Sequence, residues 1–334
     1  MPRPEGIIEL AKLRSIKGSG VGPYETPMLV PSYSSKGFQD VRHIIENTEP
    51  FIYGPVLFSA YDFAHGYLPK SITFPSLVFL DSGGYEAQKE ADLSEYFDSL
   101  NTEYRDQKGW SEKLFEKAVR DFKPLAPVVH ISYDHPSRRV PIQTQIDEAL
   151  KFGGASSQLC RELLIKPSTD RKFLDMEELT AHAKKYAPFA IVGVTEKELG
   201  ASLLDRMTNV ARLRRTLKQV HLDATPIHVF GSLDTLSTLL YFVMGADIFD
   251  GLTWLRYGYE EGRTIYRHEF AAHNFPPNKP SQDADEQCLR MNYNYLQDME
   301  LQMKAYITTG DFSSFKYNSE AIEKLAVYAW GRLV

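Results

Sequence analysis

Three aspartates end short, mostly apolar runs and are the residues best placed to do chemistry: Asp81, Asp134 and Asp250. Acids that share one concave, partly desolvated site do not keep one pKa, so one can act as a nucleophile while another carries protons. Structural roles stay open for two of them. Asp250 can instead cap the following segment, and Asp134 can form an ion pair with the nearby Arg138 or Arg139.

The most informative local pattern is the run Asp81, Ser82, Gly83, Gly84 and Tyr85. Two glycines after an apolar run allow positive φ and let a ligand approach the backbone closely. Backbone N–H groups there can hold a polar ligand edge, and the Tyr85 ring can stack on a flat ligand. A tight strand-to-helix turn explains the glycines equally well. The run matches neither the dinucleotide fingerprint nor the P-loop, so we expect no nucleotide cofactor.

The histidines and cysteines predict neither a metal site nor a disulfide. The nine histidines show no H-E-x-x-H pair or other ligand spacing, and His130, inside an apolar run, is expected to be a core residue. Cys160 and Cys288 are the only cysteines and lie far apart in the sequence, which favours a reducing compartment. No G-x-S-x-G motif is present, which argues against a hydrolase serine.

Charge and hydropathy narrow the class of protein further. The 334 residues include 38 Lys+Arg and 44 Asp+Glu, a net charge of −6. This balance excludes a uniformly basic nucleic-acid binder but allows a local basic patch. Residues 206–218 are basic, which predicts a solvated helix face or, as the alternative, a phosphate-contacting one. No window approaches the roughly eighteen apolar residues of a membrane helix, so we expect a soluble, cytoplasmic protein without membrane contact.

Apolar, β-branched runs alternate with amphipathic segments along the chain. Eight strands alternating with helices fit a closed (β/α)₈ barrel better than an open doubly wound sheet, which remains the alternative. The expected strands are 25–33, 55–62, 77–83, 127–134, 163–168, 189–194, 226–231 and 247–252. The expected helices are 37–47, 111–123, 141–162, 175–187, 200–219 and 233–244.

The barrel prediction places the acids together, because the active site of this fold lies at the C-terminal ends of the strands. Residues 84–110 are polar and read as an insertion, and the Pro- and Asn-rich residues 270–285 read as a loop or linker. A helix over 284–307 follows, whose apolar stripe we expect to pack in the core and whose N-terminus Asp283 or Asp285 would cap. We therefore divide the chain into a catalytic barrel, residues 1–270, and a C-terminal helical extension, residues 271–334.

Taken in order, these motifs resemble the tRNA-guanine transglycosylase superfamily. The family's D-S-G-G-[FY]-Q corresponds to residues 81–86, its G-V-G to residues 230–232 and its G-x-D-x-F-D-C to residues 245–251. Residues 25–31 are similar to its opening T-P-x-x-x-P strand, and Arg256 matches the arginine of its P-T-R-x-G-R motif. The similarity extends from about residue 14 to about residue 310 and is strongest in the motifs.

The resemblance implies a base exchange in tRNA or DNA that uses no cofactor. Asp250 would attack C1′ of a nucleotide and form a covalent glycosyl-enzyme as guanine leaves. Asp81 would give a proton to the departing purine and take one from an incoming 7-deazaguanine of the preQ0, preQ1 or queuine class. This is the logic of a retaining glycosidase, and the target base must first leave its stack.

The resemblance also assigns binding roles. Tyr85 and Phe230 match positions that sandwich the base, and Asp134 matches the aspartate that reads the guanine edge. The full set of base-binding residues it implies is Ser82, Gly83, Gly84, Tyr85, Asp134, Gly193, Glu198, Phe230 and Gly231. The cations expected to attract phosphates at the mouth are Arg138, Arg139, Lys166 and Arg256. A second copy of the chain or a different subunit is the kind of partner that the family allows.

The departures from the family pattern point to a divergent branch. The three-cysteine zinc motif has no counterpart, so we predict no metal. Lys166 and Pro167 replace a Q-G pair, Tyr259 replaces the final arginine, and Glu86 replaces a glutamine. One such branch is the DpdA type, which inserts 7-deazaguanine into DNA. Two other functions stay open: a non-catalytic nucleic-acid-binding subunit, and an N-glycoside hydrolase that releases the base.

Overall fold

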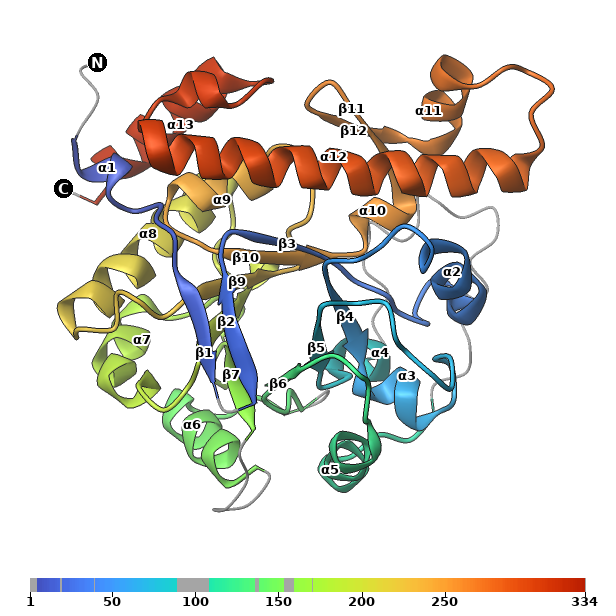
Figure 1. The fold of residues 1–334 in the computed structure, drawn as a ribbon. Helices are drawn as coiled ribbons and strands as arrows, with labels where there is room; N and C mark the ends of the chain where they lie inside the picture. Colours follow the sequence, from blue (N-terminus) through green and yellow to red (C-terminus); the bar gives the residue numbers. More distant parts are fainter. Residues whose placement is uncertain are drawn as a thin grey trace.

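The computed structural model describes residues 5–18, 20–38, 40–88, 108–135, 138–152, 159–169 and 171–333. Eight parallel strands form one sheet in the order β3-β10-β9-β8-β7-β6-β5-β4. Its ends meet at a bridge between Ser32 and Leu57, so the sheet closes into a (β/α)₈ barrel, as predicted (Figure 1). The strands are β3 (Met28–Pro31), β4 (Pro55–Ser59), β5 (Leu77–Asp81), β6 (Val128–Ile131), β7 (Cys160–Ile165), β8 (Ile191–Thr195), β9 (Ile227–Phe230) and β10 (Ile248–Gly251).

All eight predicted strands are present, and one boundary differs in a way that matters later. The predicted helix over 141–162 is α6 (Ile142–Lys151), which ends well before residue 162. Strand β7 already begins at Cys160, so Glu162 lies in the sheet, where its backbone pairs with Ile131 and Ile191. Cys160 and Leu164 both face the barrel interior, as every second residue of a strand does. The strand pattern therefore already holds at Cys160.

The barrel interior and the helix layer are two separate apolar clusters. Alternate strand residues point inward, among them Phe79, Ile131 and Ile248, and pack in layers as in other barrels of this type. The N-terminal hairpin of β1 (Ser15–Gly18) and β2 (Val21–Glu25) contributes Ile16 and Val21 to this interior cluster. The hairpin therefore adds apolar side chains to the barrel interior in addition to those of the eight strands.

Helices cover the outside of the barrel between successive strands (Figure 1). Their starts follow ordinary capping chemistry: Asp175 accepts hydrogen bonds from the backbone N–H groups of Glu177 and Glu178, and Ser202 forms a capping box with Asp205. These helices are α2 (Val41–Thr48), α3 (Ala60–Ala64), α4 (Gly84–Ala87), α5 (Glu112–Asp121), α6, α7 (Met176–His182), α8 (Leu203–Gln219) and α9 (Ser237–Val243), with the short 3₁₀ turns η2 (Ala183–Tyr186) and η3 (Glu196–Glu198). The short helix α1 (Glu5–Ile8) precedes the first strand. Most of the predicted insertion 84–110 lies outside the described residues.

One prediction about the C-terminal part was right only in part and another was wrong. Residues 270–285 are a loop only over 275–280, because α11 (Arg267–Asn274) includes the first of them and α12 (Ser281–Thr309) the last. Phe270 is buried against Gly258, which favours helix over residues 270–274, while the Pro-rich residues 275–280 form the loop. The N-cap of α12 is Pro280, without a side-chain cap, rather than Asp283 or Asp285.

The long helix α12 packs on the outside of the barrel near β3 and α2 and is joined to the segment after β10 by buried polar contacts (Figure 1). Asn292 accepts a hydrogen bond from the Tyr259 N–H at 2.8 Å and donates to the Trp254 carbonyl at 2.7 Å. The predicted apolar stripe is core, since Tyr293 and Met303 are buried. The remaining elements of this part are α10 (Thr253–Arg256), β11 (Tyr257–Glu260), β12 (Arg263–Tyr266), η4 (Phe312–Ser314) and α13 (Ser319–Gly331).

One arginine of the basic helix α8 is not solvated, contrary to the prediction for residues 206–218. Arg214 is 1 % exposed and pairs with Asp247, which also accepts a hydrogen bond from Arg14 at 2.8 Å. Asp247 lies just before β10, so this network fastens the N-terminal end of that strand. Within the described parts of the chain, no helix is both long and apolar enough to cross a membrane.

Candidate active site

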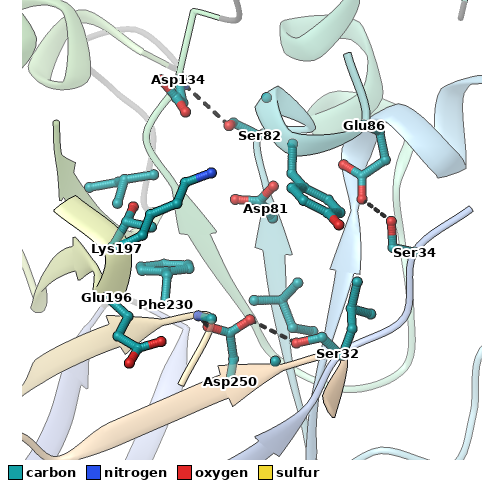
Figure 2. A pocket seen from close by; sticks show the side chains of 18 of the residues that line it. Ser32, Ser34, Asp81, Ser82, Glu86, Asp134, Glu196, Lys197, Phe230 and Asp250 are labelled. Atoms are coloured by element: carbon teal, nitrogen blue, oxygen red, sulfur yellow. Dashed lines mark hydrogen bonds between the residues drawn. The ribbon is translucent and has the colours of Figure 1, made fainter. Parts of the chain in front are cut away.

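A cavity of about 390 Å³ opens at the C-terminal ends of the strands, where the barrel prediction placed the site. Figure 2 shows Asp81 and Asp250 extending into this space from two sides, with Phe230 beside them. Eleven of the predicted site residues line it: Asp81, Ser82, Gly84, Tyr85, Asp134, Arg139, Lys166, Phe230, Gly231, Asp250 and Arg256.

Asp250 is surrounded by hydrogen-bond donors. It is 6 % exposed, and Ser32 donates to its Oδ2 at 2.7 Å (Figure 2). The backbone N–H of Gly231 donates to its Oδ1 at 3.1 Å. Donors of this kind compensate a negative charge that burial would otherwise penalise. Neither donor belongs to an arginine or a lysine, and the Nε2 atom of His228 lies 3.3 Å from Oδ1.

Asp81 is in the opposite situation. Its one hydrogen bond among the described residues comes from the backbone N–H of Gly83 at 3.0 Å. Burial, and after it the nearby negative charge of Glu86, raises the pKa of Asp81 from 3.8 to about 7. Asp134 and Asp250 contribute to the same rise. A carboxyl group with a pKa near 7 can both give and take a proton at neutral pH.

Glu86, noted in the sequence only as a departure from the family pattern, is the acid with the largest effect on Asp81. It is 5 % exposed and accepts a hydrogen bond from Ser34 (Figure 2) and another from Ser59. Desolvation raises the pKa of Glu86, and the two serines and Lys36 oppose that rise. The partly exposed Asp81 and the buried Glu86 therefore form a pair of neighbouring acids at the end of β5 and the start of α4.

The two glycines after Asp81 make room for this arrangement. Gly83 has φ of 82°, and a Cβ there would come within 2.6 Å of Tyr61. A Cβ on Gly84 would come within 2.9 Å of the Asp134 carbonyl oxygen. The turn after β5 can thus pass close to Asp134, whose backbone N–H donates to Ser82 Oγ at 3.1 Å (Figure 2).

Asp134 belongs to a compact group of two acids and two bases. Arg139 donates to Asp134 at 2.9 Å and to Glu198 at 3.2 Å. Lys166 lies 2.8 Å from Glu198 and 3.5 Å from Asp134. Burial disfavours the Lys166 ammonium, but the two acids outweigh this effect and raise its pKa. The ion pair that we considered for Asp134 is therefore present, with Arg139 and not with Arg138.

Aromatic rings border the cavity, as the resemblance implied. Phe230 is 8 % exposed and closes one side of it (Figure 2). Tyr85 also lines it, and its hydroxyl accepts a hydrogen bond from Arg256 at 3.2 Å. Lys36 lies over the Tyr85 ring, 4.4 Å from its centroid. Arg256 thus lies near the cavity mouth, where we expected a cation.

Four predicted site residues do not line the cavity. Gly83 lies in the turn described above, and Glu198 lies behind Lys166. Arg138 is exposed and pairs with Glu148 at 3.1 Å. Gly193 lies below the cavity, and a Cβ there would approach Phe230 to 2.6 Å, so its missing side chain makes room for that ring.

Several lining residues escaped the sequence analysis. Ser32 lies just beyond β3, and Lys197 extends into the cavity from the turn after β8 (Figure 2). Among the described residues, Lys197 has no ion-pair partner. Glu196 beside it accepts hydrogen bonds from Tyr241 and Arg206. Reading every barrel strand one or two residues past its end would have found Ser32, Glu196 and Lys197.

No family model and no curated protein matches the chain. The family resemblance of the motifs therefore stays a prediction. In the parts of the chain that the structure describes, no cluster of histidine, cysteine and acidic side chains has the size needed to hold a metal ion. Cys160 and Cys288 are both buried free thiols.

Proposed function

We propose that the protein exchanges guanine in tRNA or DNA for a 7-deazaguanine base through a covalent glycosyl-Asp250 intermediate. The observation that carries this proposal is the contrast between two carboxyl groups on one cavity. Asp250 accepts hydrogen bonds from Ser32 and Gly231 and lies 3.3 Å from His228, whereas burial and acidic neighbours give Asp81 a pKa of about 7. Two carboxyl groups with such different surroundings suit the separate roles of nucleophile and proton carrier.

The exchange takes two displacement steps. In the first, an Asp250 oxygen forms a bond to C1′ as the bond from C1′ to the guanine nitrogen breaks, and Asp81 gives its proton to the departing base. In the second, the nitrogen of the incoming base attacks C1′, its proton passes to Asp81, and the Asp250 carboxylate is released. The enzyme ends in its starting protonation state, so no further reactant is needed.

Asp134 and Lys166 supply the pattern that a guanine edge requires. A carboxylate only accepts hydrogen bonds and an ammonium only donates them. The two groups lie 3.5 Å apart on the cavity wall. Guanine and 7-deazaguanine present N–H donors beside a carbonyl acceptor, which matches this pair, whereas adenine presents no carbonyl there. Phe230 and Tyr85 offer ring faces for the base above and below.

Cations around the mouth support a nucleic-acid substrate. Lys197 and Arg256 line the cavity, and the exposed pair of Arg138 with Glu148 is weak enough to yield to a phosphate. Binding through such contacts weakens as salt is added, because counterions are released on association. We expect the affinity for nucleic acid to fall with rising salt; an affinity that ignores salt would indicate a free nucleoside instead.

The exchange is tested directly with tRNA and DNA that carry labelled guanine, each incubated with preQ0 or with preQ1. We expect labelled guanine to be released beyond one equivalent per enzyme only when an incoming base is present, and Asp250→Ala to abolish the release. Continued release of many equivalents without an incoming base would indicate an N-glycoside hydrolase. No release from either polymer, together with binding that needs a second chain, would indicate a non-catalytic subunit.

A further inference from the structure

Two titratable side chains lie inside the barrel, directly below the cavity, and have no part in the steps above. Glu162 on β7 and His228 on β9 are both 0 % exposed. Both point inward among apolar side chains, because Leu164 and Phe230, two residues further along the same strands, belong to the interior cluster. Buried ionisable groups in such surroundings are rare unless they are paired, and they concentrate at functional sites.

The two side chains connect to Asp250 in a row. His228 Nδ1 lies 2.8 Å from a Glu162 oxygen, and its Nε2 lies 3.3 Å from Asp250 Oδ1. The Nε2 contact is close enough for an ion pair but is not aligned as a hydrogen bond. The second Glu162 oxygen also has no hydrogen-bond partner. Such a contact can tighten when a substrate binds.

The surrounding packing keeps the row in place. The Phe230 ring stacks on the His228 ring with 3.9 Å between centroids, and Phe79 meets His228 edge-on at 5.5 Å. A Cβ on Gly193 would lie 2.7 Å from a Glu162 oxygen as well as 2.6 Å from Phe230. The missing side chain of Gly193 thus leaves space for both the acid and the ring.

The charges favour a protonated imidazole. Burial alone would lower the pKa of His228, but Glu162 and then Asp250 outweigh it and raise that pKa to about 9. The titratable groups that act on the ring are Glu162 from β7 and Asp250 from β10, while the faces toward Phe79 and Phe230 are apolar. With both ring nitrogens protonated, His228 donates toward an acid on each side.

We infer that Glu162 and His228 are positioning residues that hold a buried imidazolium against Asp250 and make it a better leaving group in the second displacement. This inference rests on the proposed function. When the bond between Asp250 and C1′ breaks, the carboxylate regains its negative charge, and the neighbouring imidazolium stabilises that charge. The same cation stabilises the free carboxylate before attack, so its benefit lies in adduct breakdown and not in adduct formation.

The charge state of His228 is tested without any substrate by ¹⁵N NMR of the histidine rings in the full chain. The His228→Gln spectrum identifies the ring among the nine histidines. We expect His228 to be doubly protonated at pH 7.5 in the wild type and neutral at that pH in Glu162→Gln. A neutral ring in the wild type, or a ring unaffected by Glu162→Gln, would overturn the inference.

The effect on the departure of Asp250 from C1′ is tested by stopping the exchange reaction with denaturant. The measured quantity is the fraction of protein bound covalently to nucleic acid. In Glu162→Gln and His228→Gln, we expect adduct breakdown to slow roughly tenfold or more, so that the trapped fraction rises above that of the wild type. A merely structural loss would lower formation and breakdown together. Glu162→Gln keeps the shape of the side chain and carries the test if His228→Gln does not fold.

His130→Gln is the matched control, because His130 is also a buried barrel histidine but lies on β6 between the inward-facing Val129 and Ile131 and so faces the helix layer. Its adduct level should equal that of the wild type. If the wild type forms the adduct and its breakdown is unchanged in both Glu162→Gln and His228→Gln, this role alone would be overturned. A wild type that forms no adduct would overturn the proposed function and this role with it.

Discussion

Asp250 and Asp81 are the same residue type and line the same cavity, but their hydrogen-bond donors and charged neighbours differ. Asp250 receives hydrogen bonds from Ser32 and Gly231, while Asp81 receives only the Gly83 N–H among the described residues and faces another buried acid. The difference arises from what the neighbouring strand ends supply: donors near β10 and acids near β5. Chemical role is thus determined by surroundings and not by residue type.

Asp247 shows what a purely structural aspartate looks like in this protein. It lies three residues before Asp250, at the other end of β10, and pairs with Arg14 and Arg214. Asp247 is 2 % exposed and does not line the cavity, so its charge only pairs with those two arginines. If Asp250 and Asp81 have the proposed roles, changing either one or its neighbours has separate effects.

The largest effect is expected from removing the nucleophile. Asp250→Ala should lower exchange by roughly 10⁴-fold or more, since no other group is placed to form the glycosyl bond. Exchange rate and trapped adduct are the measurements. Asp247→Asn is the comparison: it should lower the melting temperature while the folded fraction keeps its activity. Activity surviving Asp250→Ala would remove the proposed nucleophile.

The next effect is expected from the proton carrier. Asp81→Asn should slow adduct formation by roughly 10²- to 10⁴-fold. In the wild type, Asp81 must be protonated to release guanine, so the rate of adduct formation should be high below pH 7 and fall tenfold per unit above it. In Asp81→Asn, the rate of adduct formation should no longer decline above pH 7. If the decline is unchanged, another group supplies the proton.

A smaller effect should follow from removing one donor to Asp250. Ser32→Ala deletes the 2.7 Å hydrogen bond, and we expect exchange to fall about tenfold. The matched change Ser34→Ala removes a hydrogen bond to Glu86 instead, and should alter the pH profile more than the maximal rate. Equal profiles for the two variants would contradict the separate roles of the two regions.

Glu86→Gln should shift the pH at which the rate of adduct formation declines, with little change in the maximal rate. Removing this acidic neighbour lowers the pKa of Asp81, so the decline in adduct formation should move to lower pH. The measurement is the pH dependence of single-turnover adduct formation, with the exposed Glu177→Gln as control. A shift to higher pH would mean that Glu86 does not act through its charge.

The smallest effect concerns stability and needs no substrate. The folded protein holds the Asp81 proton up to about pH 7, whereas the unfolded chain releases it near 3.8. The folded state therefore binds more protons between these values, and the free energy of unfolding falls as pH rises through this window. At pH 8, Asp81→Asn should raise the free energy of unfolding by on the order of 1–2 kcal/mol, measured by urea titration. This value is smaller than the full pKa shift of Asp81 would give, because the side chain is partly exposed and solvent screens its charge. Reduced stability at pH 8 would contradict this account.

Periodicity and motifs predicted the eight strands and placed both acids at one end of the barrel, because those features depend on local sequence. They did not predict Glu162, since the expected helix over 141–162 hid the inward alternation of Cys160, Glu162 and Leu164. The contact of Ser32 with Asp250 joins residues 218 positions apart, and no local pattern encodes it. Helix α11 likewise forms where composition predicted a loop, because Phe270 is buried against Gly258.

The central claim is that Asp250 carries the glycosyl group. Its most direct test is to react the wild type with guanine-containing tRNA or DNA without an incoming base, denature it, digest both polymers and locate the modified peptide by mass spectrometry. The account predicts one sugar adduct, on the peptide that contains Asp250, which disappears when a 7-deazaguanine is added before denaturation. An adduct on Asp81 or elsewhere, or base exchange that proceeds with no adduct at any time, would contradict it.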